Sequence, residues 1–347
     1  MTVLSPAMFP DRFEDEDHLE DFMSTPSQAL IDDMKKIEGD LIILGVGGKM
    51  GVTLARLAKR AAPDKRVVGV ARFSEPGLQE KLNGWGVETI AADLTDRDQV
   101  EALPKLPNVI YMAGKKFGTD GNEHFTWAMN TYVPALVAQA YKGSRIVLFS
   151  TILVYPNAST LRQGCTEDVS TNAMPGEYAN SCVGRERIFQ HFSVVNGTPM
   201  LAFRLCYSQD MRYGVFSEVA TKIHRGEPVD LSAGHVNAMW QGDCNSQAIR
   251  CLLHCTSPSQ GLNISGPESV SIHALATSIA KRMGKPVTFI GEEVPSICLV
   301  NGGRGADLFG YPMVPMERVV TWISDWVSRD MTNWNKPCHY DTLNGVY

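Results

Sequence analysis

Three glycines at three-residue spacing form a pattern that could hold a phosphate group. Gly45, Gly48 and Gly51 follow the apolar run 41–44, and the residues after them have helical periodicity up to Pro63. A strand that enters a glycine turn and leaves it as a helix directs backbone N–H groups and the positive end of the helix dipole at one point. A pyrophosphate fits there because glycine has no side chain to block its approach. Glycine is also common in loops for turn geometry alone, so the flanking residues must decide between a phosphate-binding turn and a purely structural one.

The next predicted strand carries a second chemical signal. Residues 66–71 form a buried strand about twenty residues past the last glycine, as a dinucleotide-binding fold requires, and the strand ends at Arg72. An acid at that end would bind the 2′-hydroxyl of NAD, whereas arginine suits a 2′-phosphate or stacks on adenine. The pattern therefore predicts NADP or NAD with NADP modestly favoured, and Ser74 or Glu75 could alter the choice. The turn residues predicted to bind this cofactor are Gly45, Gly47, Gly48, Lys49, Met50 and Gly51.

Two further strand ends carry residues that could contact the dinucleotide. Asp93 follows the predicted strand 87–91 and could accept from the adenine amino group, or could instead cap the following helix. The predicted strand 108–114 ends in small residues, which would let the dinucleotide lie close to the backbone. The predicted cofactor contacts from these two ends are Asp93, Leu94, Met112, Ala113 and Gly114.

Alternating strands and helices must position these residues. After 41–44, 66–71, 87–91 and 108–114, further strands are predicted at 145–150 and 199–206, with helical patterns between them. This repetition predicts an α/β fold: a Rossmann-type doubly wound parallel sheet with a smaller C-terminal substrate lobe. The predicted division is an acidic arm and extra helix at 1–38, an NAD(P)-binding domain at 39–206, a mostly substrate-binding lobe at 207–330 and a tail at 331–347.

The composition excludes several classes of function. The formal net charge of −6 over 347 residues gives no basic footprint for nucleic acid. No apolar run approaches the length of a membrane span, and the eight cysteines are scattered without a signal peptide. We therefore expect a cytoplasmic protein with reduced thiols, without nucleic-acid or membrane partners.

Several motifs occur in order along roughly residues 40–330: Gly45-x-x-Gly48-x-x-Gly51, Asp93-Leu94, Asn130, residues 150–155, Tyr178, Phe203-Arg204-Leu205, residues 240–243 and residues 262–268. Taken together, these motifs resemble the extended short-chain dehydrogenase/reductases, a family of NAD(P)-dependent nucleotide-sugar epimerases and dehydratases. The resemblance implies that Thr151 hydrogen-bonds a substrate hydroxyl or carbonyl, that Tyr178 exchanges its proton, and that a hydride moves to or from the nicotinamide. It also implies a sugar-like small-molecule substrate, with Ser150 among its contacts, and a homodimer.

The tyrosine motif departs from the family because Cys182 stands where the family has lysine. One helical turn separates it from Tyr178, so both would face the cofactor, where the lysine binds the nicotinamide ribose and favours tyrosinate. A tyrosine phenol with a pKa of about 10 is about one part in a thousand ionised at pH 7. One positive charge ~4 Å away is worth roughly 4 kcal/mol at an effective dielectric of ~20. A catalytic base therefore needs a replacement charge, which we predict from Lys115, Lys116 or Arg185, or partly from oxidised nicotinamide.

Other polar residues have competing interpretations. Cys182 is either a small buried hydrophobic residue or a thiolate beside the cofactor, which would need a lowered pKa. Arg212, His235 and Arg304 are candidate substrate contacts, although surface cations are usually only solvated. No metal site is predicted, because the last three of Cys244, Cys251, His254 and Cys255 share one helical pattern, whereas zinc normally needs two separate ligand pairs.

Three functions are compatible with these sequence features. The favoured one is an NAD(P)-dependent oxidoreductase or epimerase/dehydratase-like enzyme acting on a sugar-like hydroxyl or carbonyl, with Tyr178 as acid/base and Thr151 and Lys115 beside it. The alternative is a non-catalytic NAD(P)-binding sensor, supported by the absent lysine. An interaction scaffold has only the acidic arm and the aromatic tail in its favour.

Overall fold

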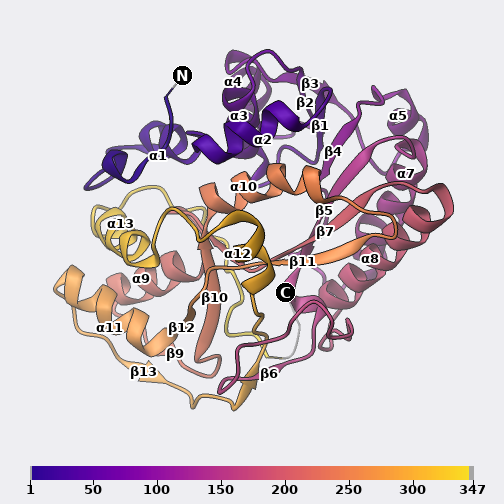
Figure 1. The fold of residues 1–347 in the computed structure, drawn as a ribbon. Helices are drawn as coiled ribbons and strands as arrows, with labels where there is room; N and C mark the ends of the chain where they lie inside the picture. The colour runs from indigo at the N-terminus through magenta and orange to yellow at the C-terminus, as the bar shows by residue number, and fades with distance from the viewer. Residues whose placement is uncertain (1, 344–347) are drawn as a thin grey trace.

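A computed structural model describes residues 2–343 of the chain, and its centre is a seven-stranded sheet flanked by helices (Figure 1). The strand order is β3-β2-β1-β4-β5-β7-β11, and every neighbouring pair is parallel. The predicted Rossmann-type doubly wound sheet is therefore confirmed. The strands are β1 (Leu41–Leu44), β2 (Val67–Ala71), β3 (Glu88–Ala91), β4 (Asn108–Tyr111), β5 (Arg145–Thr151), β7 (Met200–Leu205) and β11 (Gln260–Ile264).

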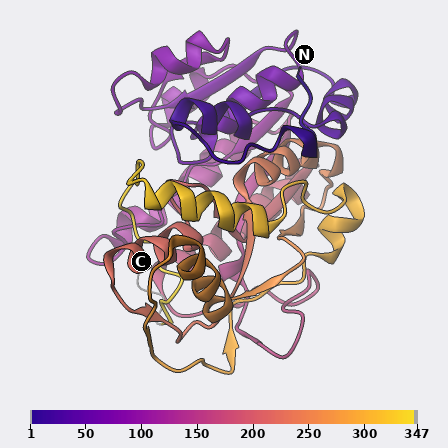
Figure 2. The ribbon, with the colours of Figure 1, turned by 90° about the vertical axis from the view of Figure 1, so that its left-hand side faces the viewer.

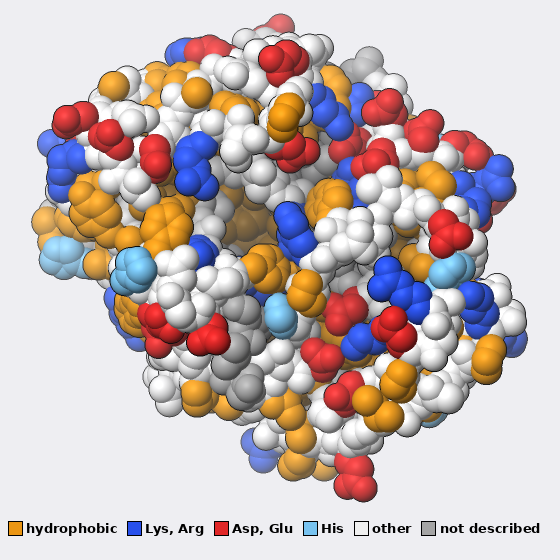
Figure 3. Space-filling view, turned by 180° about the vertical axis from the view of Figure 1, so that it is seen from behind, with side chains coloured by type: hydrophobic (Ala, Val, Ile, Leu, Met, Phe, Trp, Pro, Cys, Tyr) orange, Lys and Arg blue, Asp and Glu red, His pale blue; other side chains and the backbone are white. Residues whose placement is uncertain are grey.

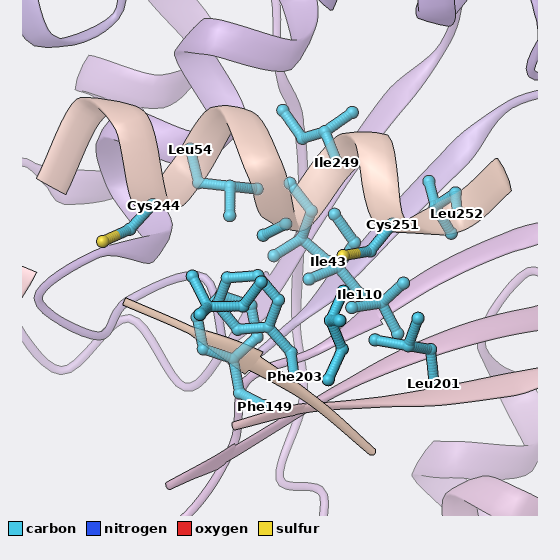
Figure 4. Close-up of a cluster of buried hydrophobic side chains, with 14 of the residues drawn as sticks. Ile43, Leu54, Ile110, Phe149, Leu201, Phe203, Cys244, Ile249, Cys251 and Leu252 are labelled. Atoms are coloured by element: carbon cyan, nitrogen blue, oxygen red, sulfur yellow. The ribbon is translucent and has the colours of Figure 1, made fainter. Parts of the chain in front are cut away.

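Both faces of the sheet are covered, which explains why its strands are continuous apolar runs. In β1, Ile43 joins one hydrophobic cluster, whereas Ile42 and Leu44 join another on the opposite face. The cluster around Ile43 includes side chains from α2, α3, α10 and η4, part of which Figure 4 shows, and the other cluster includes α5, α7 and α8. These elements are α2 (Gln28–Lys36), α3 (Gly51–Ala61), α5 (Arg97–Ala102), α7 (Val133–Ala140), α8 (Glu177–Asn196), α10 (Gln241–Arg250) and η4 (Cys251–His254).

The sheet order reverses between β1 and β4, since β2 and β3 extend to one side and β5, β7 and β11 to the other. Ligands of open α/β sheets bind outside the carboxyl ends of the strands at such a switch point. The connecting elements on this part of the chain are α4 (Leu78–Gly84), α6 (Glu123–Trp127), the π-helical segment η2 (Ala128–Tyr132), η3 (Ile152–Val154) and β6 (Ala158–Ser159).

A second group of elements lies beside the sheet and has its own hydrophobic cluster. Its three-stranded sheet has the order β12-β10-β8, and helices α9, α11 and α13 contribute buried side chains. In Figure 2, α13 lies below the N-terminal helices. The elements are β8 (Tyr207–Gln209), α9 (Val215–Arg225), β9 (Val229–Asp230), β10 (His235–Trp240), β12 (Ser269–Ser271), α11 (Ile272–Met283), β13 (Phe289–Ile290), β14 (Ser296–Ile297), α12 (Gly303–Phe309) and α13 (Met316–Ser328).

The acidic N-terminal arm packs its apolar side chains into this second cluster. Phe13, Leu19 and Phe22 are at most 5% exposed and contact the same cluster as Trp240 and Trp322. In α1 the apolar residues repeat at helical spacing, so they can be buried together, and one carboxylate of the arm, that of Glu20, is buried with them. The arm contains η1 (Pro6–Met8) and α1 (Glu16–Met23).

The helix that precedes β1 and the C-terminal tail are also packed into the fold. The side chain of Ser27 caps α2, which contacts α3 and α10 over a face of the sheet and does not cover its edge. In the tail, Cys338 and Tyr340 are buried against the second cluster. Within residues 2–343, no helix is both long and apolar enough to cross a membrane.

Candidate active site

A cavity of about 360 Å³ lies at the carboxyl ends of β1, β4 and β5. It extends from the glycine turn at Gly45 and Gly48 to Thr151 and to Tyr178 at the start of α8. The second group of elements supplies another wall, which includes Tyr213. Figure 3 shows the molecule from behind, hollowed near the centre of this face, with lysine or arginine side chains at the edge of the hollow.

The glycines of the turn are needed for different physical reasons. Gly45 has φ +96°, and a Cβ there would lie 2.6 Å from the backbone nitrogen of Ala113. At Gly51 a Cβ would collide with the carbonyl oxygen of Val46. Gly45 therefore lets the turn after β1 approach the backbone that follows β4, and Gly51 lets the start of α3 approach Val46 in the turn. At Gly48 the nearest atom to a Cβ would be 3.5 Å away, and Gly48 lines the cavity, so its missing side chain leaves space for a ligand.

The turn also offers donors to a phosphate. Gly48 N–H donates to Gly45 O at 3.2 Å, and Gly51 N–H donates to Gly48 O at 3.1 Å, which closes the turn. The backbone N–H groups of Lys49 and Met50 donate to no residue that the structure describes. They directly precede the eleven-residue helix α3. This arrangement fits the pyrophosphate of a dinucleotide.

The predicted adenine-side residues lie apart from this cavity. Arg72 is exposed at the end of β2, and Leu94 is buried. The Asp93 carboxylate accepts from Thr95 N–H at 2.9 Å, and this hydrogen bond is the main cause that lowers the pKa of Asp93. Asp96, not Asp93, caps α5. Asp93 therefore orders the turn after β3 and holds its carboxylate ionised near Arg72.

Gly114, which follows β4, is required by the packing of the protein itself, with or without a ligand. A Cβ at Gly114 would collide with the guanidinium of Arg185 and lie 3.0 Å from Asn130 Oδ1. Asn130 holds the backbone of Lys115, accepting from its N–H and donating to its carbonyl oxygen, both at 2.9 Å. The packing of Arg185 therefore requires a glycine here in addition to the predicted cofactor contact, and Gly114 and Met112 line the cavity while Ala113 packs behind them against Gly45.

Cys182 is fully buried one turn after Tyr178 on α8. Burial is the main cause that raises the pKa of its thiol, and the nearby Arg185 and a hydrogen bond with Tyr178 oppose the shift only in part. A raised pKa keeps the thiol neutral at physiological pH. The geometry thus favours a small buried residue over a thiolate catalyst.

The three candidate replacement cations occupy different surroundings. Lys115 Nζ lies 5.2 Å from the centroid of the Phe125 ring, whereas Lys116 Nζ lies 5.9 Å from that of Tyr178. Lys116 Nζ also donates to the carbonyl oxygen of Cys338 at 3.2 Å, and burial lowers its pKa. Arg185 is 5% exposed, donates to Phe149 O at 2.9 Å and acts electrostatically on Tyr178. Lys115 also lines the cavity, but its ammonium packs on Phe125, whereas Lys116 and Arg185 interact with Tyr178.

Ser150 also reaches the cavity but has another partner. Its hydroxyl donates to Glu186 Oε1 at 2.6 Å, and Glu186 pairs with Arg204 at 2.7 Å. Thr151 lines the cavity and accepts from Leu153 N–H at 3.3 Å, so its own hydroxyl proton is not used in that bond. Thr151 is the better placed of the two for a substrate.

The predicted substrate residues of the C-terminal lobe do not line this cavity. Arg212 is 3% exposed and pairs with Asp210 at 2.9 Å and Glu20 at 2.8 Å, which raises its pKa and ties the arm to the lobe. His235 lies 3.7 Å from Glu293, and Arg304 donates to Gln260 at 2.8 Å. These residues follow strands or loops that end elsewhere, so their positions give no support to substrate contact.

Sequence reasoning missed several cavity residues. Phe117, Tyr207, Tyr213 and Cys338 line the cavity, although none belongs to a local motif. Cys338 reaches it only because the tail folds back over the second group of elements. Cys244 and Cys251 are buried members of the apolar cluster of Figure 4, and no group of metal-binding side chains occurs among residues 2–343.

Comparisons with known proteins find similar solved structures but no similar curated sequences. Neither protein-family models nor curated protein sequences match the chain. A solved structure of UDP-glucuronic acid 4-epimerase from Bacillus cereus in complex with NAD is similar at TM-score 0.70 and 17% identity, covering 84% of this chain and 96% of that one. The enzyme WbmH from Bordetella bronchiseptica with NAD+ has TM-score 0.69 and 20% identity, covering 83% and 98%.

A third similar structure contains the other nicotinamide cofactor. RMD from Pseudomonas aeruginosa, complexed with NADPH, has TM-score 0.67 and 19% identity, covering 84% of this chain and 100% of that one. At these identities the likeness establishes a shared fold. This chain therefore has the fold of these NAD- and NADPH-bound proteins across most of its length.

Proposed function

We propose that this protein is an NAD(P)-dependent enzyme of the extended short-chain dehydrogenase/reductase type. Its substrate is a sugar or a sugar-nucleotide-like molecule, on which it acts at a hydroxyl or carbonyl group. The observation that carries the proposal is that the glycine turn, Thr151 and Tyr178, far apart in sequence, line one cavity. Similar structures that hold UDP-glucuronic acid with NAD, or UDP-glucose with NAD, support the same substrate class.

The residues of this cavity fit a dinucleotide. The backbone N–H groups of Lys49 and Met50 and the space beside Gly48 would hold its pyrophosphate, and Arg72 and Asp93 would lie at its adenosine end. When bound, the dinucleotide supplies a nicotinamide that accepts or returns a hydride. We favour NADP over NAD because Arg72, and no acid, directly follows β2.

Tyr178 is the proposed acid/base of the reaction. Its phenolate takes the proton of a substrate hydroxyl during oxidation, and its phenol returns that proton during reduction. Thr151 donates a hydrogen bond to the same substrate oxygen. The positive charges of Lys116 and Arg185 favour the phenolate over the phenol. In this proposal they together replace the family lysine, whose position Cys182 occupies.

Calorimetric titration with NAD+ and NADP+ tests the first step. Protein saturated with the tighter dinucleotide is then incubated with UDP-glucuronic acid or UDP-glucose, and the sugars are separated by chromatography, since a redox-neutral reaction leaves no net change at 340 nm. The Tyr178→Phe variant should lose roughly 10²- to 10⁴-fold in turnover and bind the dinucleotide unchanged. Failure of the wild type to bind either dinucleotide would refute the proposal, and binding without turnover would favour a sensor.

We also propose a homodimer in the cytoplasm. Val194 and Val195 on α8 are 60% and 63% exposed, and Tyr132 on the adjacent η2 is 46% exposed, which gives this side apolar surface for a second copy. All eight cysteines are free, which suits a reducing compartment. Sedimentation of wild type against Val194→Asp tests the dimer: equal monomeric masses would refute it.

A further inference from the structure

The side chain of Lys49 enters the active-site cavity between two aromatic rings. Its Nζ lies 3.2 Å from the ring centroid of Tyr213 and 4.2 Å from that of Phe117. The nitrogen is inaccessible to solvent and has no hydrogen-bond acceptor among the residues that the structure describes. Burial is the main cause that lowers the pKa of Lys49 to about 7. Cation–π contacts offset only part of the cost of burying an ammonium, so a ligand acceptor would complete this site.

A second ammonium lies near the first. Lys116 Nζ is 5.4 Å from the centroid of the same Phe117 ring, and its charge adds to the lowering of the Lys49 pKa. No aspartate or glutamate is among the described residues that line the cavity. Glu218 acts electrostatically on Lys116, but its carboxylate already accepts from Cys338 N–H at 2.8 Å and lies 3.6 Å from Lys222 Nζ. The two lysines thus form a positive region, and the part of its wall that the structure describes carries no aspartate or glutamate.

We propose that Lys49 and Lys116 form an anion-binding subsite, and that the substrate places a carboxylate or a phosphate there. The inference rests on the proposed function in taking the substrate to share this cavity with the dinucleotide. Carboxylate and phosphate oxygens accept several charge-assisted hydrogen bonds, so such a group would supply an acceptor to Lys49 while the charge of Lys116 adds to the attraction. Since Lys116 also lies beside Tyr178, a bound anion would be close to the acid/base.

The position of the Lys49 ammonium favours the substrate over the cofactor as the source of this anion. Its backbone N–H belongs to the turn that would receive the pyrophosphate, whereas its side chain contacts Tyr213, which lies between β8 and α9 in the second group of elements. One residue would thereby serve two ligands, the cofactor by its main chain and the substrate by its side chain.

Calorimetric titration at pH 6.5 with D-glucuronate and with inorganic phosphate tests the subsite, and D-glucose is the neutral control. Each titration is done with the protein free and saturated with NAD+ or NADP+. The wild type should bind at least one of the anions, more tightly than glucose, in both states. Lys49→Met should weaken that binding roughly 10- to 100-fold, because a charge-assisted hydrogen bond is lost, and Lys49→Arg should largely restore it. Lys142→Met, which removes an exposed lysine between α7 and β5, should change nothing.

Three results would overturn the inference. One is no saturable anion binding to the wild type, and another is equal binding by Lys49→Met and Lys142→Met with both variants folded by circular dichroism. The third is complete loss of anion binding when the dinucleotide saturates the protein, which would assign the subsite to the cofactor pyrophosphate. Failure of the proposed function is a separate result, since it appears as no dinucleotide binding while the titrations of the free protein still decide the subsite.

Discussion

The guanidinium of Arg185 on α8 fills the place in which a side chain of Gly114, after β4, would stand. The same guanidinium donates to Asn130, whose amide holds the backbone of Lys115. The loop that carries Lys115 and Lys116 is therefore fixed by the buried Arg185 guanidinium, which packs on the backbone of Gly114, and by the Asn130 amide. The hydrogen bond between Arg185 and Asn130 therefore links the loop after β4 to α8, the helix that carries Tyr178.

Gly114→Ala should destabilise the protein, because the added methyl group must displace the buried Arg185 side chain. Overpacking of this kind costs about 1–3 kcal/mol, and urea unfolding would measure it. Gly143→Ala is a matched control, since nothing lies within 4 Å of a Cβ there. Equal free energies of unfolding for the two variants would show that Arg185 moves aside without cost.

Lys116→Met should lower turnover more than Lys115→Met does. Lys116 Nζ lies 5.9 Å from the centroid of the Tyr178 ring. A positive charge at about this separation is worth about 3 kcal/mol at an effective dielectric of about 20, so a loss on the order of 100-fold is expected, with dinucleotide affinity largely kept. Lys115 is the control because its ammonium packs on Phe125 at 5.2 Å. Steady-state kinetics on both variants check this, and a larger loss for Lys115→Met would reverse the assignment.

Arg72→Ala should reduce the preference for NADP over NAD. Loss of one exposed arginine contact to a 2′-phosphate should weaken NADP binding about tenfold and leave NAD binding nearly unchanged. Calorimetric dissociation constants for both dinucleotides give the ratio. Parallel weakening of the two would indicate instead that Arg72 stacks on adenine, which both cofactors share.

The stability of the ligand-free protein should depend on pH through Lys49, whose pKa is lowered from 10.5 to about 7. Between these two values the unfolded chain binds more protons than the folded chain, so the free energy of unfolding rises with pH in this window. Below pH 7 the full cost of burying the ammonium is present, and above pH 10.5 it is absent.

The comparison of wild type with Lys49→Met isolates this contribution. From pH 10 down to pH 7 the wild type should lose stability relative to the variant, and below pH 7 the difference should stay constant. Lys116, Lys336, Cys338 and His339 also act electrostatically at this site and remain in both proteins. A difference that does not vary between pH 7 and pH 10 would mean that the Lys49 ammonium is not desolvated.

The sequence by itself determined the sheet and the glycine turn. Short continuous apolar strands such as 41–44 can be buried only between two layers of helices, and Gly51 is required by a close backbone contact with Val46 within one βα unit. These are local constraints, so the pattern of neighbouring residues carries them. The cavity end at Thr151 and Tyr178 was also accessible, through resemblance to a family.

Only the tertiary structure decided which charges meet inside the cavity. Lys115 and Lys116 are adjacent in sequence, yet one packs on Phe125 and the other lies near Tyr178, because the Asn130 amide fixes the backbone between them and the sheet. Arg212 pairs inside the fold with Asp210 and with Glu20, a residue far away in the sequence. Such partners come from elements that meet only when the sheet, the lobe, the arm and the tail pack together, so no local pattern contains them.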